Sequence, residues 1–89
     1  MSEKRGNQHT PPRGKVLGLS EGRAAAAGMR RLRTTAELTA VELARRFGFG
    51  PEWVHGREKG SIRMTQAEAE KIAAVLGTDY AGLLAAGAP

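Results

Sequence analysis

The apolar positions from residue 39 to residue 60 recur at helical spacing in two short runs, with a glycine-rich turn between them. In the first run, Leu43 and Phe47 would share one face of a helix, while the charged residues beside them would face water. The second run is shorter and more polar, so its helix would bury only one edge. The pattern therefore predicts one helix from about residue 40 to the glycines and another at about 51–59.

Local chemistry supports both helix boundaries. Thr39 stands three positions before Glu42, the spacing of a capping box, in which each side chain bonds the other residue's backbone N–H. Gly48 can adopt the left-handed conformation that ends a helix, and Gly50 followed by Pro51 suits an N-cap and a first turn. One helix is thus predicted to stop and another to start within three residues.

The faces of the second helix follow from its periodicity. If Val54 points to the core, a rotation of ~100° per residue places Glu58 near it. Trp53 and Arg57 then share one flank, where a guanidinium can stack on an indole. Two helices joined in this way form a helix-turn-helix, and the face opposite the core would be free to enter a DNA groove. That face carries Glu52, His55, Gly56 and Lys59.

Further helices are predicted on both sides of this pair. A first helix should start after Ser20, an N-cap residue, and run through an alanine tract to about Thr34. Gly28 should weaken this helix by ~1 kcal/mol relative to alanine. Residues 61–64 are predicted to form a loop.

The C-terminal part predicts two more helices. Thr65 and Glu68 form a second capping box, and Gly77 would end the helix that follows. Thr78 or Asp79 would then cap a short fifth helix. No strand-like alternation competes, so the domain is predicted to be all-α. The inward-facing residues of the fourth helix are expected to be Ala69, Ile72, Ala73 and Leu76. The fifth helix carries Tyr80, Leu83 and Leu84, which would support a weak dimer or complete the core.

Composition narrows the class of protein. The 89 residues suffice for one small domain, assigned to 20–89, and leave no room for a second, ligand-sensing domain. The absence of cysteine excludes disulfides and thiolate metal sites. Neither an apolar run of ~18 residues nor a signal-peptide pattern occurs. A soluble cytoplasmic protein with no membrane partner is expected.

The positive charge is concentrated at the N-terminus. Residues 1–19 contain four basic residues and one acidic residue, a net +3 out of the chain's +5. The segment is rich in glycine and proline and poor in apolar groups, so it is predicted to be an arm that is disordered without a partner. Such an arm would track a phosphate strand or enter a minor groove, and a solubilising tail is the alternative. Its candidate contacts are Lys4, Arg5, Arg13 and Lys15.

These patterns together resemble the Xre/Cro family of prokaryotic and phage repressors. The resemblance spans about two thirds of the chain, from Met29 to Gly87. It implies a five-helix, lambda-repressor-like DNA-binding domain that usually serves as a transcriptional repressor. It rests on Leu38-Thr39, Leu43-Ala44, Phe47-Gly48, Val54, Glu58-Lys59-Gly60 and Ile72-Ala73-x-x-Leu76-Gly77.

Two positions depart from the family pattern. Ala40 replaces a glutamine that often opens the second helix and touches a phosphate in the family, so that contact is expected to be missing. Arg57 stands where the family usually has an apolar residue, which puts the packing of the third helix in question.

The candidate DNA contacts form two sets, one that would contact bases and one that would contact the phosphate backbone. The alternative for each set is that its members are solvated surface residues without a partner. Base edges are read by polar groups on an exposed helix face, whereas phosphates are held by charges and by N–H groups near helix ends. Arg57 would reach a phosphate or stack on Trp53, and the basic run Arg30, Arg31 and Arg33 is more typical of a solvated face. The expected base-contacting residues are Glu52, Trp53, His55, Gly56 and Lys59, and the expected backbone-contacting residues are Thr39, Arg45, Arg46, Arg57, Ser61, Arg63 and Thr65.

The sequence gives little support for a catalytic function. His9 and His55 are the only histidines, and neither has a nucleophile, a carboxylate or metal-ligand spacing beside it. No catalytic residue, metal, cofactor or small-molecule ligand is therefore predicted.

Two hypotheses about function remain. The first is a sequence-specific double-stranded DNA-binding transcriptional regulator, a small Cro-like or immunity-type repressor of phages or mobile elements. The alternative is an antitoxin or adaptor that keeps the fold but binds a protein through Trp53, the fifth helix or the arm. A weak homodimer through the C-terminal helix and a monomer both agree with the sequence.

Overall fold

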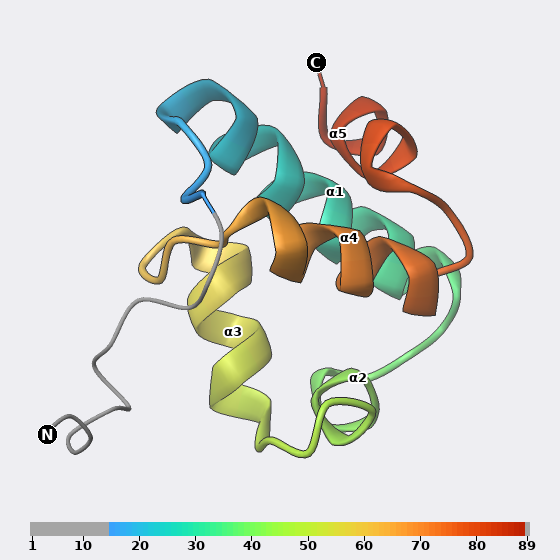
Figure 1. Cartoon of the computed structure of the whole chain (residues 1–89). Coiled ribbons are helices and arrows are strands. Elements are labelled where there is room, and N and C mark those ends of the chain that lie inside the picture. Colours follow the sequence, from blue (N-terminus) through green and yellow to red (C-terminus); the bar gives the residue numbers. More distant parts are fainter. Residues whose placement is uncertain (1–14, 89) are drawn as a thin grey trace, which may run out of the picture.

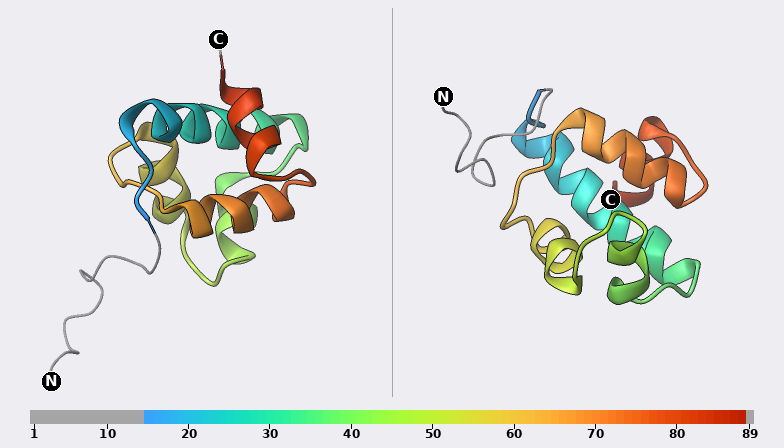
Figure 2. Two further views of the ribbon diagram at one scale, coloured as in Figure 1. Left: turned by 45° about the horizontal axis from the view of Figure 1, so that its top comes forward. Right: turned by 60° about the horizontal axis from the view of Figure 1, so that its bottom comes forward.

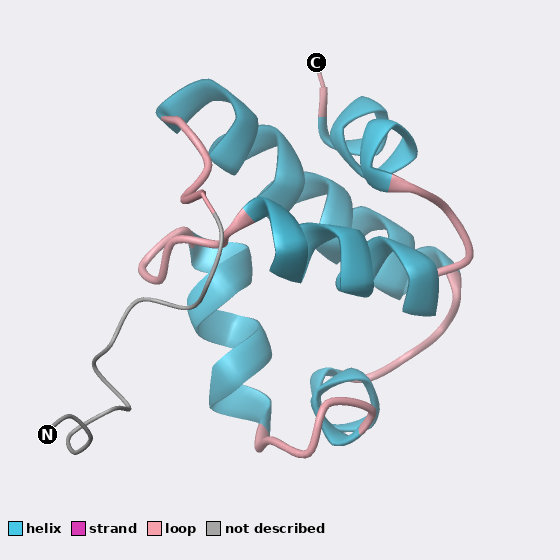
Figure 3. Ribbon diagram, viewed as in Figure 1, coloured by secondary structure: helices cyan, strands magenta, loops and turns pink. Residues whose placement is uncertain are grey.

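Five α-helices account for the regular structure of residues 15–88, the part of the chain that the computed structural model describes (Figure 1). Within this range the helices are joined by loops, and no strand occurs (Figure 3). The prediction of an all-α, five-helix domain is confirmed. The helices are α1 (Leu19–Thr35), α2 (Ala40–Arg45), α3 (Pro51–Lys59), α4 (Gln66–Val75) and α5 (Tyr80–Gly87).

Reciprocal side-chain to backbone bonds fix the starts of α2 and α4. At α2, Thr39 Oγ1 accepts from the Glu42 N–H at 3.1 Å, and the Glu42 carboxylate accepts from the Thr39 N–H at 2.8 Å. Thr65 and Glu68 make the same two bonds at α4, at 3.0 and 3.3 Å. Both predicted capping boxes are present, so these helices begin where the sequence places them.

Glycines shape the turn between α2 and α3 and end α3, as predicted. Gly48, in the turn after α2, has φ of 81°, and Gly60, which caps the end of α3, has φ of 85°. Residues with a side chain rarely adopt this conformation, so both positions favour glycine. Gly50 is the N-cap of α3 and Pro51 occupies its first turn.

Every helix contributes to one core. α1 packs along α5 and also contacts α3 and α4, whereas α2 packs mainly on α3 (Figure 2). Burial of a large apolar side chain contributes roughly 1.5–3 kcal/mol, so this core fixes the orientation of α2 and α3 on α1. The fully buried large side chains are Met29 of α1, Leu43 of α2, Val54 of α3, Ile72 of α4 and Leu83 of α5.

The contact between α1 and α5 depends on two glycines. A Cβ atom at Gly28 would collide with the carbonyl oxygen of Leu83, and one at Gly87 would collide with the carbonyl oxygen of Ala24. The sequence indicated that Gly28 only weakens α1. In the structure it also lets the α5 backbone lie directly against α1.

The apolar side chains of α5 pack into the core to a greater extent than the sequence indicated. Asp79, one of the two candidate caps, accepts from the Gly82 N–H at 2.8 Å. Leu83 is fully buried, and Tyr80 and Leu84 pack against the core. The apolar surface that we expected to support a weak homodimer is therefore used mainly inside the domain.

The folded part of the chain begins before the boundary expected at residue 20. The Leu17 N–H donates to the Met64 carbonyl and the Gln66 N–H donates to the Lys15 carbonyl, both at 2.9 Å, and the Leu17 side chain is buried. We call residues 15–17 the N-terminal strap. The strap holds the chain against the loop before α4. After it, α1 starts at Leu19 with Gly18 as its N-cap, so the prediction of a Ser20 cap is wrong.

Three of the four expected arm contacts, Lys4, Arg5 and Arg13, lie outside the described residues. Lys15 lies inside them and is exposed at the start of the strap.

Candidate nucleic-acid interface

The outer face of α3 has the polarity that the sequence predicted. Val54 is fully buried, whereas Glu52, His55 and Lys59 are exposed. α3 and α2 together form the lower part of the molecule in Figure 1, with α3 running down to the turn that joins it to α2. A helix held in this way presents its polar face to any partner that approaches from that side.

An arginine of α1 fixes the inner flank of α3. Arg33 Nε donates to Glu58 Oε2 at 2.7 Å and Nη2 donates to Glu58 Oε1 at 3.0 Å. Arg33 Nη1 also donates to the Leu38 carbonyl at 2.8 Å, just before α2 begins. The hydrogen bond to Glu58 raises the pKa of Arg33 above its ordinary value. This bidentate pair joins α1, the start of α2 and α3, so Arg33 serves inside the domain.

An aromatic cluster fixes the other flank. The Trp53 ring stacks on Phe47, with centroids 4.9 Å apart, and on Phe49, with centroids 5.2 Å apart and planes 9° from parallel. The Arg57 guanidinium carbon lies 4.2 Å from the centre of a Trp53 ring, so the predicted pair is present. Trp53 is half-buried in this cluster, and Phe49 covers it from the solvent side.

Arg57 is directed inward, which corrects its expected role at a phosphate. Only 8% of its surface is exposed. Its Nη2 donates to Glu68 Oε2 at 3.1 Å and its Nη1 donates to the Trp53 carbonyl at 3.3 Å. A charge thus occupies the usually apolar position because an indole face and a carboxylate surround it. Among the described residues its Nε has no hydrogen-bond partner.

Gly56 is less open than the sequence suggested. A Cβ atom built on Gly56 would lie 2.8 Å from Ile62 Cδ1, and the Ile62 N–H donates to the Gly56 carbonyl at 3.1 Å. The side chain of Ile62 therefore fills the space that a residue-56 side chain would occupy. We expected the Gly56 backbone to approach DNA directly, but the structure places an apolar group over it.

The residues expected to contact phosphates differ in how far their side chains are exposed to solvent. Thr65 has no exposed surface and its hydroxyl accepts from the Glu68 N–H, so it is withdrawn from the set. Thr39 is exposed at the start of α2, although its hydroxyl already accepts from the Glu42 N–H. The other members that are exposed are Arg45, Arg46, Ser61 and Arg63.

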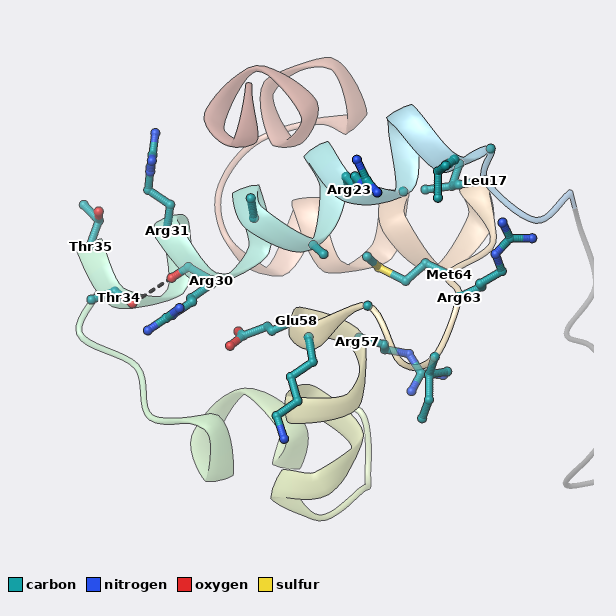
Figure 4. Close-up of a pocket in the computed structure, with 18 residues that line it drawn as sticks. Leu17, Arg23, Arg30, Arg31, Thr34, Thr35, Arg57, Glu58, Arg63 and Met64 are labelled. Carbon is teal, nitrogen blue, oxygen red and sulfur yellow. Dashed lines mark hydrogen bonds between the residues drawn. The ribbon is translucent and has the colours of Figure 1, made fainter. Parts of the chain in front are cut away.

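A basic groove of about 830 Å³ runs between α1 and the C-terminal end of α3 (Figure 4). Its acidic member, Glu58, is already paired with Arg33. The figure shows arginines entering from α1 on one side and from the loop after α3 on the other. The basic residues that line the groove are Arg23, Arg30, Arg31, Lys59 and Arg63, together with the buried Arg57.

The groove is lined by arginines that the sequence did not predict to lie together. Arg30 and Arg31 appeared only as part of a basic run, and Arg23 was not singled out. Arg23 and Arg30 are seven residues apart, which is two helical turns, so their common face was a signal that the sequence offered. Their meeting with Arg63 depends on the path of residues 60–64.

Other kinds of site are not formed by residues 15–88. This part of the chain contains no group of three or more histidine, cysteine, aspartate or glutamate side chains arranged to hold a metal ion. None of its helices is both long and apolar enough to span a membrane.

Comparison with known families agrees with this geometry. The sequence model described as a helix-turn-helix domain matches residues 24–86. The chain belongs to this helix-turn-helix domain family, and it is a DNA-binding protein of that class. Searches among curated proteins and among solved structures found no match.

Proposed function

We propose that this protein is a sequence-specific double-stranded DNA-binding transcriptional regulator of the Xre/Cro type, a small repressor like those of phages and mobile elements. α3 would lie in the major groove. The observation that carries the proposal is the polarity of α3 within a helix-turn-helix: Val54 is buried, and Glu52, His55 and Lys59 are exposed on other faces.

The exposed residues of α3 suit base recognition. A carboxylate such as Glu52 accepts from cytosine N4, and Lys59 donates to guanine O6 or N7. His55 donates through a ring N–H. Each lost base contact is worth ~1–3 kcal/mol, so His55→Ala and Lys59→Ala should relax or weaken operator binding without unfolding the domain.

The basic groove suits a phosphate strand beside α3. Arg30 and Arg63 lie on opposite sides of it, and Lys59 connects it with the exposed face of the helix. On the other side of α3, Arg45 and Arg46 are exposed at the C-terminal end of α2. Positive charge thus flanks the helix on both sides, as a duplex with two phosphate strands requires.

Selection from a random pool of duplex DNA, followed by titration of the best sequence at several salt concentrations, tests the proposal. Each phosphate contact contributes a slope of about −0.9 in log K against log salt. We expect Arg30→Gln and Arg63→Gln each to reduce the slope by about one contact. Lys71→Gln is the matched control, because Lys71 is exposed on α4 and does not line the groove.

Two results would overturn this function. One is a pool that yields no preferred sequence, and the other is affinity that does not change with salt. The symmetry of the selected sites would also report whether one copy or two bind, since half-sites one helical turn apart indicate a dimer.

A second candidate function is supported by the apolar groups near α3. Phe49 and Ile62 are exposed beside its polar face, and surfaces of this kind also bind proteins. An antitoxin or adaptor would use them to hold a protein partner. A stoichiometric protein complex isolated from the native host, together with failure of the DNA selection, would favour this candidate.

A further inference from the structure

Two exposed apolar side chains frame the exposed face of α3. Phe49 is 54% exposed and stands two residues before the helix, whereas Ile62 is 44% exposed and follows it in the loop. Each is held in place by α3 itself.

Ile62 acts as the missing side chain of residue 56. Gly56 is two residues after the core-facing Val54, a rotation of ~200°, so its Cα faces away from the core. Ile62 Cδ1 lies 2.8 Å from the position that a Gly56 Cβ would take. The branched apolar group therefore stands on the outer face of the C-terminal half of α3.

Phe49 is fixed at the other end of the helix. Its ring lies nearly parallel to Trp53, which is stacked in turn on Phe47. A ring that rests on a half-buried cluster loses little freedom when it meets a partner, so it is pre-organised for contact. The more exposed face and edges of Phe49 are turned to solvent.

The surroundings of both groups suit a polyanion. Ile62 is adjacent to exposed Arg63 and close to Lys59 in the basic groove. Phe49 follows exposed Arg45 and Arg46. An apolar peptide would leave these charges desolvated or unpaired, whereas a duplex satisfies them with phosphates while its groove floor meets the apolar groups.

The major groove offers one apolar group, the C5-methyl of thymine. We propose that Phe49 and Ile62 are specificity-determining residues that read thymine methyl groups at the two ends of the α3 footprint. The inference rests on the proposed function and adds to it the chemical identity of part of the operator. Polar residues between them read the intervening base pairs.

Replacing thymine by deoxyuridine, one position at a time, in the sequence selected from the random pool tests the inference. The change removes the methyl group and keeps the base pairing. We expect one thymine near each end of the α3 footprint at which deoxyuridine weakens binding about fourfold, the value for loss of one buried methyl-sized group. Ile62→Ala should abolish the effect at one position and Phe49→Ala at the other.

Val41→Ala is the matched control, because Val41 is an exposed apolar residue on α2 that does not line the basic groove. It should leave both deoxyuridine effects intact, and helical content of each variant should match that of the parent. A deoxyuridine effect that persists in both Ile62→Ala and Phe49→Ala overturns the inference, as does specific binding with no deoxyuridine effect. Both leave the proposed function standing. A pool with no preferred sequence overturns the proposed function and the inference with it.

Discussion

The two flanks of α3 are each held by an arginine and a glutamate, but in different ways. On the α1 side, Arg33 makes two hydrogen bonds to Glu58 and a third to a backbone carbonyl. On the Trp53 side, Arg57 makes one bond to Glu68, which is also engaged in the α4 capping box, and one to the Trp53 carbonyl. The first flank is held by directional bonds, and the second mainly by stacked rings.

The difference shows what each flank allows. A bidentate pair fixes the rotation of α3 about its axis, and thereby the direction of the exposed side chains. A stack of rings with an arginine over it tolerates small shifts, because dispersion and cation–π attraction vary slowly with position. We therefore expect the Arg33 side to determine the orientation of α3 and the Trp53 side to determine how tightly the turn closes.

The largest effect is expected from Glu58→Ala. The change leaves the partly buried Arg33 guanidinium without its carboxylate, and breaking a pair held by two charged hydrogen bonds costs up to about 3 kcal/mol. Urea unfolding of the variant measures the loss. The double variant Arg33→Met with Glu58→Leu should recover most of it. A loss below 1 kcal/mol in the single variant would contradict the role of this pair.

Trp53→Ala should have the next largest effect. It removes the ring on which Phe47, Phe49 and Arg57 all rest, and a half-buried tryptophan contributes about 2–3 kcal/mol. Thermal unfolding measures this change. Trp53→Phe is the control, since it keeps a ring and should recover more than half of the loss.

Arg57→Met should change the free energy of unfolding by no more than about 1 kcal/mol. Methionine can keep an apolar contact with Trp53, and Glu68 stays solvated because part of its side chain is exposed. Arg57→Ala, which also removes the packing, should destabilise more. If Arg57→Met lowered the free energy of unfolding as much as Glu58→Ala does, the ion pair would be equally important on both flanks. That result would contradict the difference between the two flanks.

The smallest effect concerns the start of α2. The hydrogen bond from the Thr39 backbone N–H, followed by the bond with its side chain, lowers the pKa of Glu42. A lowered folded-state pKa adds stability above the ordinary glutamate pKa of about 4.3, and this is lost as pH falls towards the folded value. Glu42→Gln should flatten that part of the stability curve, as measured by thermal unfolding between neutral and acid pH. An unchanged pH dependence would show that the capping box contributes little.

Much of the fold could be predicted because its signals are local. Thr39 with Glu42 and Thr65 with Glu68 are three residues apart, and Gly48 and Gly60 act on their own backbone. Helical periodicity also placed Leu43 on the inner face of its helix, and its side chain is fully buried. Each of these predictions needs only the few residues on either side.

The rest of the site depends on contacts between distant residues. Arg33 and Glu58 are 25 positions apart, and no spacing rule joins them. Ile62 covers Gly56 because of the path that the loop takes after α3. Thr65 was expected to touch a phosphate because it lies near a helix end in the loop after α3, whereas the strap and α4 leave it with no exposed surface. The prediction for Gly28 used only its helix propensity, which does not include its contact with α5.

The N-terminal strap sets practical limits on how this chain can be altered. Trimming that stops before Lys15 leaves both backbone bonds of the strap in place, whereas removal of Leu17 would open the core beside Met64. Any purification tag or fluorescent label joined ahead of Lys15 would emerge next to the loop that carries Arg63. A label at the C-terminal end, after α5, avoids that loop and is the better choice for binding measurements.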